Sequence, residues 1–137
     1  QFKEILENAV SRVEFGDGRF AQILGFSYTW DPAGTPQVLN ADGTVATPGT
    51  RVVDVTLDDG TAIVVGGAVV DGPPINVATI DFLAQGGDQY PFRGAPFTTL
   101  GVTYQLALAN YIEFGLNGLI SAADYPFGGE GRIVQLP

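Results

Sequence analysis

An amphipathic helical pattern at residues 2–13 constrains the possible folds of this chain most strongly. Its apolar positions recur at helical spacing and are Phe2, Ile5, Leu6, Ala9, Val10 and Val13. Glu4, Glu7 and Arg12 fall on the other side of the helix. Because such a helix must cover its apolar face with another element, the pattern predicts a helix packed on a sheet.

The first strands of that sheet are expected between residues 19 and 65. The chain holds 19 glycines and 9 prolines, so its elements should be short and joined by tight turns. Aromatic and β-branched residues predict a strand within 19–30, and the turn-rich stretch 33–49 reads as a long surface hairpin. Alternating segments at 51–57 and 61–65, joined by Asp58-Asp59-Gly60, predict a second hairpin.

The second half of the chain adds a helix and further strands. Residues 75–80 resemble a buried strand, and 81–90 a short helix or turn that leads into a Gly-rich loop. A second helix is predicted at 103–114, with Gly115 as its stop, and a closing strand at 131–136. We therefore expect an α+β fold over residues 1–137, as one layered domain with a mainly antiparallel sheet and two main helices.

The charge of the chain excludes several partners. Acidic residues outnumber basic ones by 15 to 6, the net charge is −9, and Lys3 is the only lysine. A nucleic acid is not expected as a partner because its backbone requires clustered cations. Membrane insertion is not expected either, because no apolar run reaches the roughly 18 residues of a transmembrane helix. A small anionic ligand stays open, because local geometry can oppose the net field.

The absence of histidine and cysteine narrows the possible chemistry. It removes the Ser-His-Asp and Cys-His nucleophile schemes and the commonest ligand of transition metals. An all-carboxylate site for magnesium or calcium remains conceivable, but the ligand spacing of a calcium loop is missing. We therefore expect no catalytic residue, metal or cofactor in this chain.

The most informative motif is the run DFLAQGGDQY at residues 81–90. The pair Gly86-Gly87 allows a tight turn or a close approach of the backbone to a ligand. Asp88 can bond neighbouring amides and hold the loop, so that Tyr90 projects from a rigid platform. Taken alone, a Gly-Gly-Asp triplet is more typical of a tight turn followed by a core tyrosine.

The longer run changes that interpretation. It resembles a D-F-L-A-x-G-G-D-G-aromatic motif in the C-terminal domain of the 5′-nucleotidase and UDP-sugar hydrolase family. Three more segments resemble motifs of that family in the same order, namely GRFAQILG at 18–25, PGTRV at 48–52 and EGRI at 130–133. The opening FKEILENAVS is similar to the helix that precedes them, so the resemblance covers nearly the whole chain.

The resemblance implies a division of labour in a larger, secreted protein. This chain would hold a nucleoside or nucleotide, while a separate N-terminal metallophosphoesterase domain with two divalent metal ions would hydrolyse the phosphate ester. The chain would then be truncated on its N-terminal side and inactive alone, although the parent would be an enzyme. The expected location is extracellular, periplasmic or at the cell surface.

The resemblance also implies a base sandwiched between two aromatic rings, which correspond here to Phe20 and Tyr90. A stacked base contributes roughly 1–3 kcal/mol and tolerates different bases. The loop residues Gly86, Gly87, Asp88 and Gln89 complete the expected substrate site.

This sequence departs from the family pattern at two points of that site. Gln89 stands where the family usually has glycine, and its side chain could reach over the pocket or face solvent. The family often carries an acid for the ribose hydroxyls a few residues beyond the second aromatic, and residues 91–96 offer none. Arg19 and Arg93 are the cations nearest to the expected pocket in sequence.

Two other readings remain open at this point. The fold could be kept as a non-catalytic extracellular or cell-surface module, which the altered motif positions and the long hairpin at 33–47 would suit. The acidic, Gly-rich strands with aromatics would also suit a carbohydrate-binding sandwich. An upstream metal-ligand set of the D-x-H and G-N-H-E type would identify an enzyme, and calorimetry with adenosine against simple sugars would test the carbohydrate reading.

Overall fold

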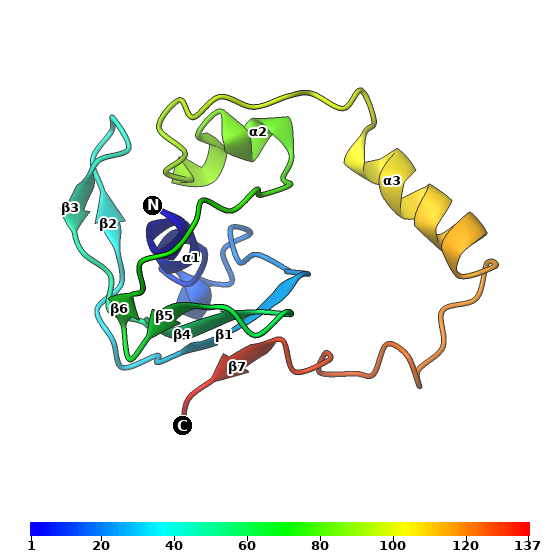
Figure 1. The fold of residues 1–137 in the computed structure, drawn as a ribbon, viewed down its shortest axis with the longest axis horizontal. Helices are drawn as coiled ribbons and strands as arrows, with labels where there is room; N and C mark the ends of the chain where they lie inside the picture. Colours follow the sequence, from blue (N-terminus) through cyan, green and yellow to red (C-terminus); the bar gives the residue numbers. More distant parts are fainter. The chain divides into compact units, whose positions relative to one another are not determined.

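The computed structural model describes residues 1–137, which form two compact units (Figure 1). The first unit comprises Gln1–Ala95 and Gly131–Pro137, and the second comprises Pro96–Glu130. The expectation of a single domain stays a prediction.

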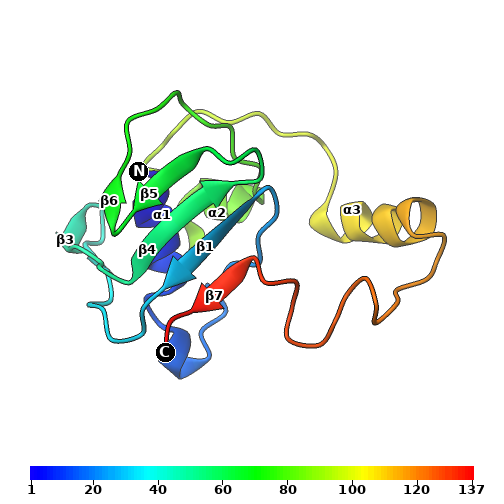
Figure 2. The same ribbon diagram turned by 60° about the horizontal axis from the view of Figure 1, so that its bottom comes forward.

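The first unit is built on a five-stranded sheet with the order β6-β5-β4-β1-β7 (Figure 2). Its strands are β1 (Phe26–Trp30), β4 (Val52–Leu57), β5 (Ala62–Val65), β6 (Ala68–Val69) and β7 (Ile133–Gln135). All neighbours pair antiparallel except β7, which runs parallel to β1 with Ile133 opposite Tyr28. The expected α+β fold with a mainly antiparallel sheet is confirmed.

Helix α1 (Phe2–Ala9) lies between the sheet and the segment that contains α2 (Asp81–Ala84), as Figure 1 shows edge-on. Two groups of buried side chains fill these layers. The sheet cluster comprises Leu6, Val10, Tyr28, Trp30, Val52, Val55 and Val64, and the loop cluster comprises Ile5, Ala9 and Tyr90. Because α1 is covered on two sides, every residue from 5 to 11 is buried.

Burial on two sides changes the role of the polar face of α1. Glu7 was expected opposite the apolar stripe, yet it is only 1% exposed. Its carboxylate accepts the backbone N–H groups of Arg51 and Val52, each at 3.1 Å, and pairs with the Lys3 ammonium at 2.7 Å. These bonds satisfy the buried charge and join α1 to the start of β4.

The structure corrects two expected strands and one helix boundary. The predicted helix at 2–13 ends at Ala9, and a 3₁₀ turn follows at Val13–Phe15. The predicted strand at 19–30 begins only at Phe26, because Gly25 adopts φ 90°, which interrupts an extended strand. Residues 75–80 form no strand, because apolar composition alone does not provide a pairing partner and this run pairs with no strand of the sheet.

The predicted hairpins are confirmed. Strands β4 and β5 pair directly, and β2 (Val38–Leu39) pairs with β3 (Val45–Thr47) in a separate two-stranded sheet. The β2–β3 hairpin is fastened to α1, because the amide of Gln37 donates to the carbonyl of Glu4 at 2.8 Å. The hairpin that the sequence presents as a surface decoration is therefore attached to the core of the first unit.

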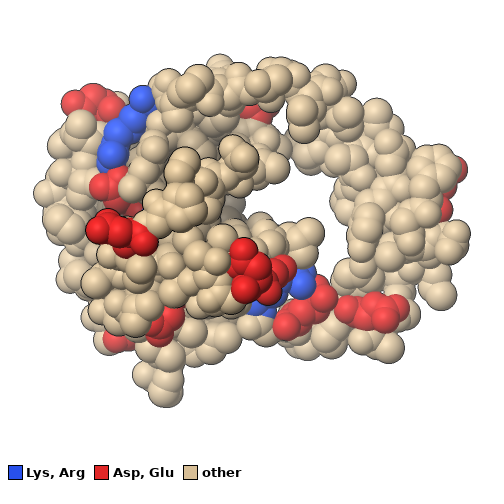
Figure 3. All heavy atoms as spheres, in the orientation of Figure 1, with Lys and Arg blue, Asp and Glu red and all other residues tan.

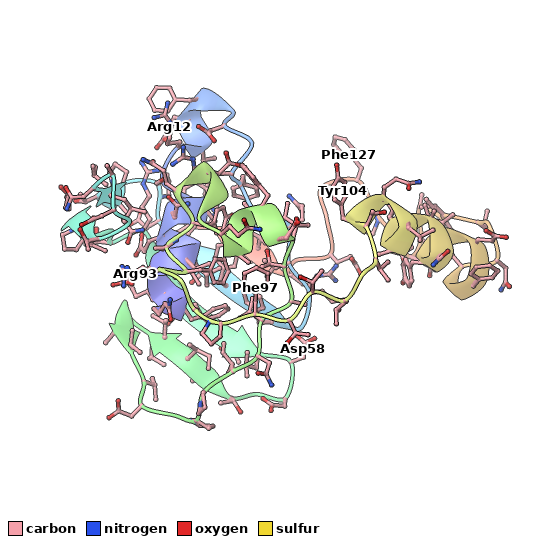
Figure 4. The ribbon with its side chains drawn as sticks, turned by 90° about the horizontal axis from the view of Figure 1, so that it is seen from above. Arg12, Asp58, Arg93, Phe97, Tyr104 and Phe127 are labelled. Carbon is pink, nitrogen blue, oxygen red and sulfur yellow. The ribbon has the colours of Figure 1, made fainter.

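The second unit contains the predicted second helix. Helix α3 (Tyr104–Asn110) is capped by Thr103, whose hydroxyl accepts the Leu106 N–H, and it continues as a π turn, η3 (Tyr111–Gly115). Gly115 therefore marks the end, as predicted. No side chain between 96 and 130 is buried, and Tyr104 and Phe127, labelled in Figure 4, are among the exposed aromatics. None of the helices in either unit has both the length and the apolar character needed to cross a bilayer.

Candidate functional site

The loop from Gly86 to Tyr90 has an unusual backbone. Gly86 adopts φ 93°, and the next residues form a 3₁₀ turn, η2 (Gly87–Gln89). Asp88 and Gln89 follow with φ 50° and 59°, a left-handed region that few residues other than glycine occupy. A side chain at position 87 is excluded sterically, because a Cβ on Gly87 would lie 2.5 Å from the ring of Phe82. The loop is thus tightly turned and strained at two neighbouring positions.

Tyr90 ends this loop inside the first unit. Its ring is 5% exposed, belongs to the loop cluster and stacks on Phe92 with 6.4 Å between ring centroids. Its hydroxyl donates to the backbone carbonyl of Arg19 at 2.6 Å. Burial, and then the nearby charge of Asp88, raise the pKa of Tyr90 to about 12, so the hydroxyl stays a neutral donor at physiological pH.

Phe20 occupies a different environment. It is partly buried and packs against the sheet cluster, whereas Tyr90 belongs to the loop cluster. The Tyr90 ring stacks on Phe92 and makes no ring contact with Phe20. The structure therefore brings the two motif segments together, through the bond from Tyr90 to Arg19, without bringing the two rings into contact.

A closed set of polar contacts joins the two motif segments around Arg19. Its Nη1 donates to the side-chain oxygens of Asn8 at 3.5 Å and Gln89 at 3.4 Å. The Asn8 amide in turn donates to the backbone carbonyl of Asp88 at 3.1 Å. Asn8 is 2% exposed, so this buried side chain fixes α1, the loop and Arg19 relative to one another.

Asn8 is the residue of this site that the sequence reading missed. The helical periodicity of residues 2–13 places it on no particular face, and only its poor helix propensity gives a signal. The partner could not be read from the helix, because the Asn8 amide bonds the backbone of Asp88, which lies 80 residues further along the chain.

The charge at the site is locally balanced. Arg19 Nε lies 3.0 Å from a carboxylate oxygen of Asp17, and the backbone N–H of Arg19 donates to the same oxygen. These hydrogen bonds from Arg19, backbone first, lower the pKa of the Asp17 carboxyl. On the face shown in Figure 3, basic groups likewise lie directly beside acidic ones.

The second candidate cation, Arg93, has a different role. Its Nη2 lies 2.8 Å from the Glu4 carboxylate, and its Nε donates to the carbonyl of Gly43 at 3.0 Å. Figure 4 shows the Arg93 side chain beside α1. Arg93 thus ties the β2–β3 hairpin and α1 together, and it makes no hydrogen bond or ion pair with the loop at 86–90.

Other polar groups lie apart from this site. A shallow hollow on the sheet, lined in part by Ser27, Asp54 and Thr56, shares no residue with the loop at 86–90 or with the segment at 18–20. Asp54 there accepts hydrogen bonds from Gly66 N–H and the Thr29 hydroxyl. No three His, Cys, Asp or Glu side chains gather in an arrangement that could hold a metal ion.

Comparisons with known proteins agree with this architecture. Residues 1–94 match the family model described as 5′-nucleotidase, C-terminal domain. The solved structure of a 5′-nucleotidase precursor from Thermus thermophilus superposes with a TM-score of 0.64 over 98% of this chain at 23% identity, which supports the same fold. The chain spans 23% of the length of that precursor. No curated protein sequence is significantly similar to it. Since the family model matches more than half of the chain, this protein belongs to the family of 5′-nucleotidase C-terminal domains.

Proposed function

We propose that this chain is the nucleotide-recognising part of a 5′-nucleotidase-type phosphohydrolase. The observation that carries the proposal is the meeting of two motif segments, 18–20 and 86–90, around Arg19. The family membership supports the same role. Since the segments lie about 70 residues apart in sequence, their fixed junction suits a binding site better than a local turn.

The nucleoside base would stack at this junction. Phe20 offers a partly exposed ring beside Arg19, and a ring of this kind accepts the π-face of any base. In the proposed sandwich Tyr90 contacts the other face of the base. Because the Tyr90 ring is only 5% exposed, binding must uncover it, which requires movement of the loop at 86–90. The strained backbone of Asp88 and Gln89 lowers the cost of such a movement.

Hydrolysis would take place on another domain of the same protein. A metallophosphoesterase domain with two divalent ions would activate water there, while this chain positions the phosphate by holding the base. The resemblance to secreted enzymes and the acidic composition support an extracellular, periplasmic or cell-surface location. Metal-dependent release of phosphate from AMP by the purified 137-residue chain would refute this division of labour.

Calorimetry with the purified chain tests the binding role directly. We expect AMP and adenosine to bind, and simple sugars not to bind. Replacing Phe20 by alanine should weaken binding by roughly 1–3 kcal/mol, the worth of one stacked base. The control is Phe15→Ala, which removes a ring that is 74% exposed and lies outside both motifs.

The outcomes separate the functional classes. Equal binding by both phenylalanine variants would place the nucleotide elsewhere on the chain. Binding of sugars but not of adenosine would favour a carbohydrate-binding module, and no binding of either would favour a structural module that kept the fold.

A further inference from the structure

The exit segment, residues 91–93, follows the loop at 86–90 and is held from two sides by Arg93. On the side of α1, Arg93 Nη2 pairs with Oε2 of Glu4 at 2.8 Å (Figure 4). This oxygen is shielded from solvent and has no hydrogen-bond partner besides the guanidinium. On the side of the β2–β3 hairpin, Arg93 Nε donates to the backbone carbonyl of Gly43 at 3.0 Å. One guanidinium therefore joins the exit segment to a helix and to a hairpin.

The tip of the hairpin presents the carbonyl of Gly43 from a turn that is fixed by its own hydrogen bonds. The Gly43 N–H donates to the carbonyl of Asn40 at 3.0 Å. The Asp42 carboxylate accepts both the N–H of Thr44 at 2.9 Å and its hydroxyl at 2.6 Å. Because the base of the hairpin is also bonded to α1, the whole hairpin is a firm attachment point for Arg93.

The exit segment is coupled to Tyr90 through Phe92, the residue before Arg93. The Phe92 ring stacks on the Tyr90 ring, with 6.4 Å between their centroids. The Phe92 N–H donates to the Tyr90 carbonyl at 2.9 Å, and the Tyr90 N–H donates to the Gly87 carbonyl at 3.0 Å. A displacement of Arg93 therefore moves Phe92, which covers one part of the Tyr90 ring.

We propose that Arg93, Glu4 and the carbonyl of Gly43 form a clasp, through which the β2–β3 hairpin controls how often the exit segment opens and uncovers Tyr90. The Arg93 side chain is 34% exposed, so its ion pair contributes modestly and the clasp can open while the sheet stays folded. The restraint needs no ligand. Only its consequence for nucleotide binding, which requires an uncovered Tyr90, rests on the proposed function.

Hydrogen exchange followed by NMR tests the clasp in the unliganded chain. The amide hydrogens of Tyr90 and Phe92 are bonded within the loop and the exit segment, so they exchange when these open. Arg93→Ala removes both ties at once, and the two amides should then exchange about tenfold faster. The amides of β4 should keep their wild-type rates, because Arg93 makes no hydrogen bond or ion pair with the sheet.

Two further variants assign the effect to the clasp. Arg12→Ala is the matched control, because Arg12 also forms a partly exposed ion pair, with Asp17 at 2.9 Å, outside the clasp. It should leave the exchange of both amides unchanged. Glu4→Gln removes the charge of the ion pair and keeps the bond from Arg93 to Gly43. Its acceleration should therefore be smaller than that of Arg93→Ala, about threefold.

Each outcome decides for or against the clasp. Faster exchange that is confined to the loop and the exit segment, and is largest in Arg93→Ala, supports it, even if calorimetry finds no nucleotide binding. Unchanged exchange in Arg93→Ala refutes it, and so does an equal acceleration in β4, which would show a general loss of stability. If Glu4→Gln reproduces the whole effect of Arg93→Ala, the hairpin has no part in the restraint, and the clasp is likewise refuted.

Discussion

Gln89 carries backbone strain that a glycine would not. A residue with a side chain at φ 59° costs of order 1 kcal/mol relative to glycine. We therefore expect Gln89→Gly to lower the free energy of unfolding by about 1 kcal/mol less than a glycine substitution at a residue with negative φ. Urea denaturation followed by circular dichroism measures the change.

The matched control for that measurement is Gln85→Gly. Gln85 has φ −86°, which any residue adopts, so glycine there should destabilise by about 0.5–1 kcal/mol. Loss of stability in Gln89→Gly of the same size as in Gln85→Gly would show that the loop stores no strain at position 89.

Tyr90 should make the folded state sensitive to alkaline pH. Burial, and then the charge of Asp88, raise its pKa to about 12, whereas an unfolded tyrosine titrates near about 10. Between these values the folded chain holds a proton that the unfolded chain has lost. The contribution of Tyr90 to the free energy of unfolding should therefore be fully present below a pH of about 10. It should be lost as the pH rises from there toward 12.

Tyr90→Phe tests this expectation. The variant lacks the titrating group, so its stability should decline less between pH of about 10 and 12. At neutral pH it should be less stable by about 1 kcal/mol, because the bond to the Arg19 carbonyl is lost. Tyr104→Phe, at a residue that is 74% exposed, serves as the control and should keep the wild-type pH profile.

Among the elements, those with strong turn signals could be predicted from sequence and those that depend on partners could not. The β4–β5 hairpin follows from Asp58-Asp59-Gly60 between two alternating segments. The run at 75–80 has the apolar composition of a strand, but it pairs with neither open edge of the sheet, that of β6 or that of β7. Composition indicates what a segment tolerates, whereas pairing depends on distant residues.

The same limit applies to the candidate site. The loop at 86–90 could be located because glycine at two positions and an aromatic at the end form a local pattern. The burial of Glu7 and Asn8 could not, because periodicity does not distinguish a helix covered on one side from one covered on two.

Besides Glu7, the buried side chain of Arg51 joins the end of α1 to the start of β4. Arg51 is 5% exposed, and its guanidinium donates to the carbonyls of Val10 at 2.7 Å and Gly34 at 3.2 Å and pairs with Glu14. We expect Arg51→Ala to lower the free energy of unfolding by about 2–3 kcal/mol, since it leaves the Val10 and Gly34 carbonyls without this donor.

Arg12→Ala is the comparison for Arg51→Ala. Arg12 also pairs with a carboxylate, that of Asp17 at 2.9 Å, but its side chain is 52% exposed. Its removal should cost no more than about 1 kcal/mol. Thermal denaturation of both variants measures the two losses of stability. Losses of similar size would mean that burial does not strengthen the Arg51 contacts.

At the scale of the whole molecule, the two units differ in how well buried side chains protect their backbone amides from exchange with solvent. The first unit contains both clusters of buried side chains, whereas the second contains no buried side chain. A helix as short as α3 is only marginally stable in water without packing. We therefore expect amide hydrogens of α3 to exchange orders of magnitude faster than those of β1 and β4.

Hydrogen–deuterium exchange followed by mass spectrometry measures this difference peptide by peptide. The peptide that covers α1 provides an internal reference, because residues 5–11 are all buried. Slow exchange throughout 104–110, at the rate seen in β4, would contradict the expectation and show that α3 is stabilised by packing.

The parallel pairing of β7 with β1 has a consequence for synthesis of the protein. Tyr28 pairs with Ile133, so one edge of β1 stays unpaired until on the order of a hundred further residues have been synthesised. A ribosome adds these residues in roughly 5–20 s. During that interval the open edge of β1 can accept a strand from a neighbouring nascent chain. Slow codons between the two strands would lengthen this exposure, and fast ones would shorten it.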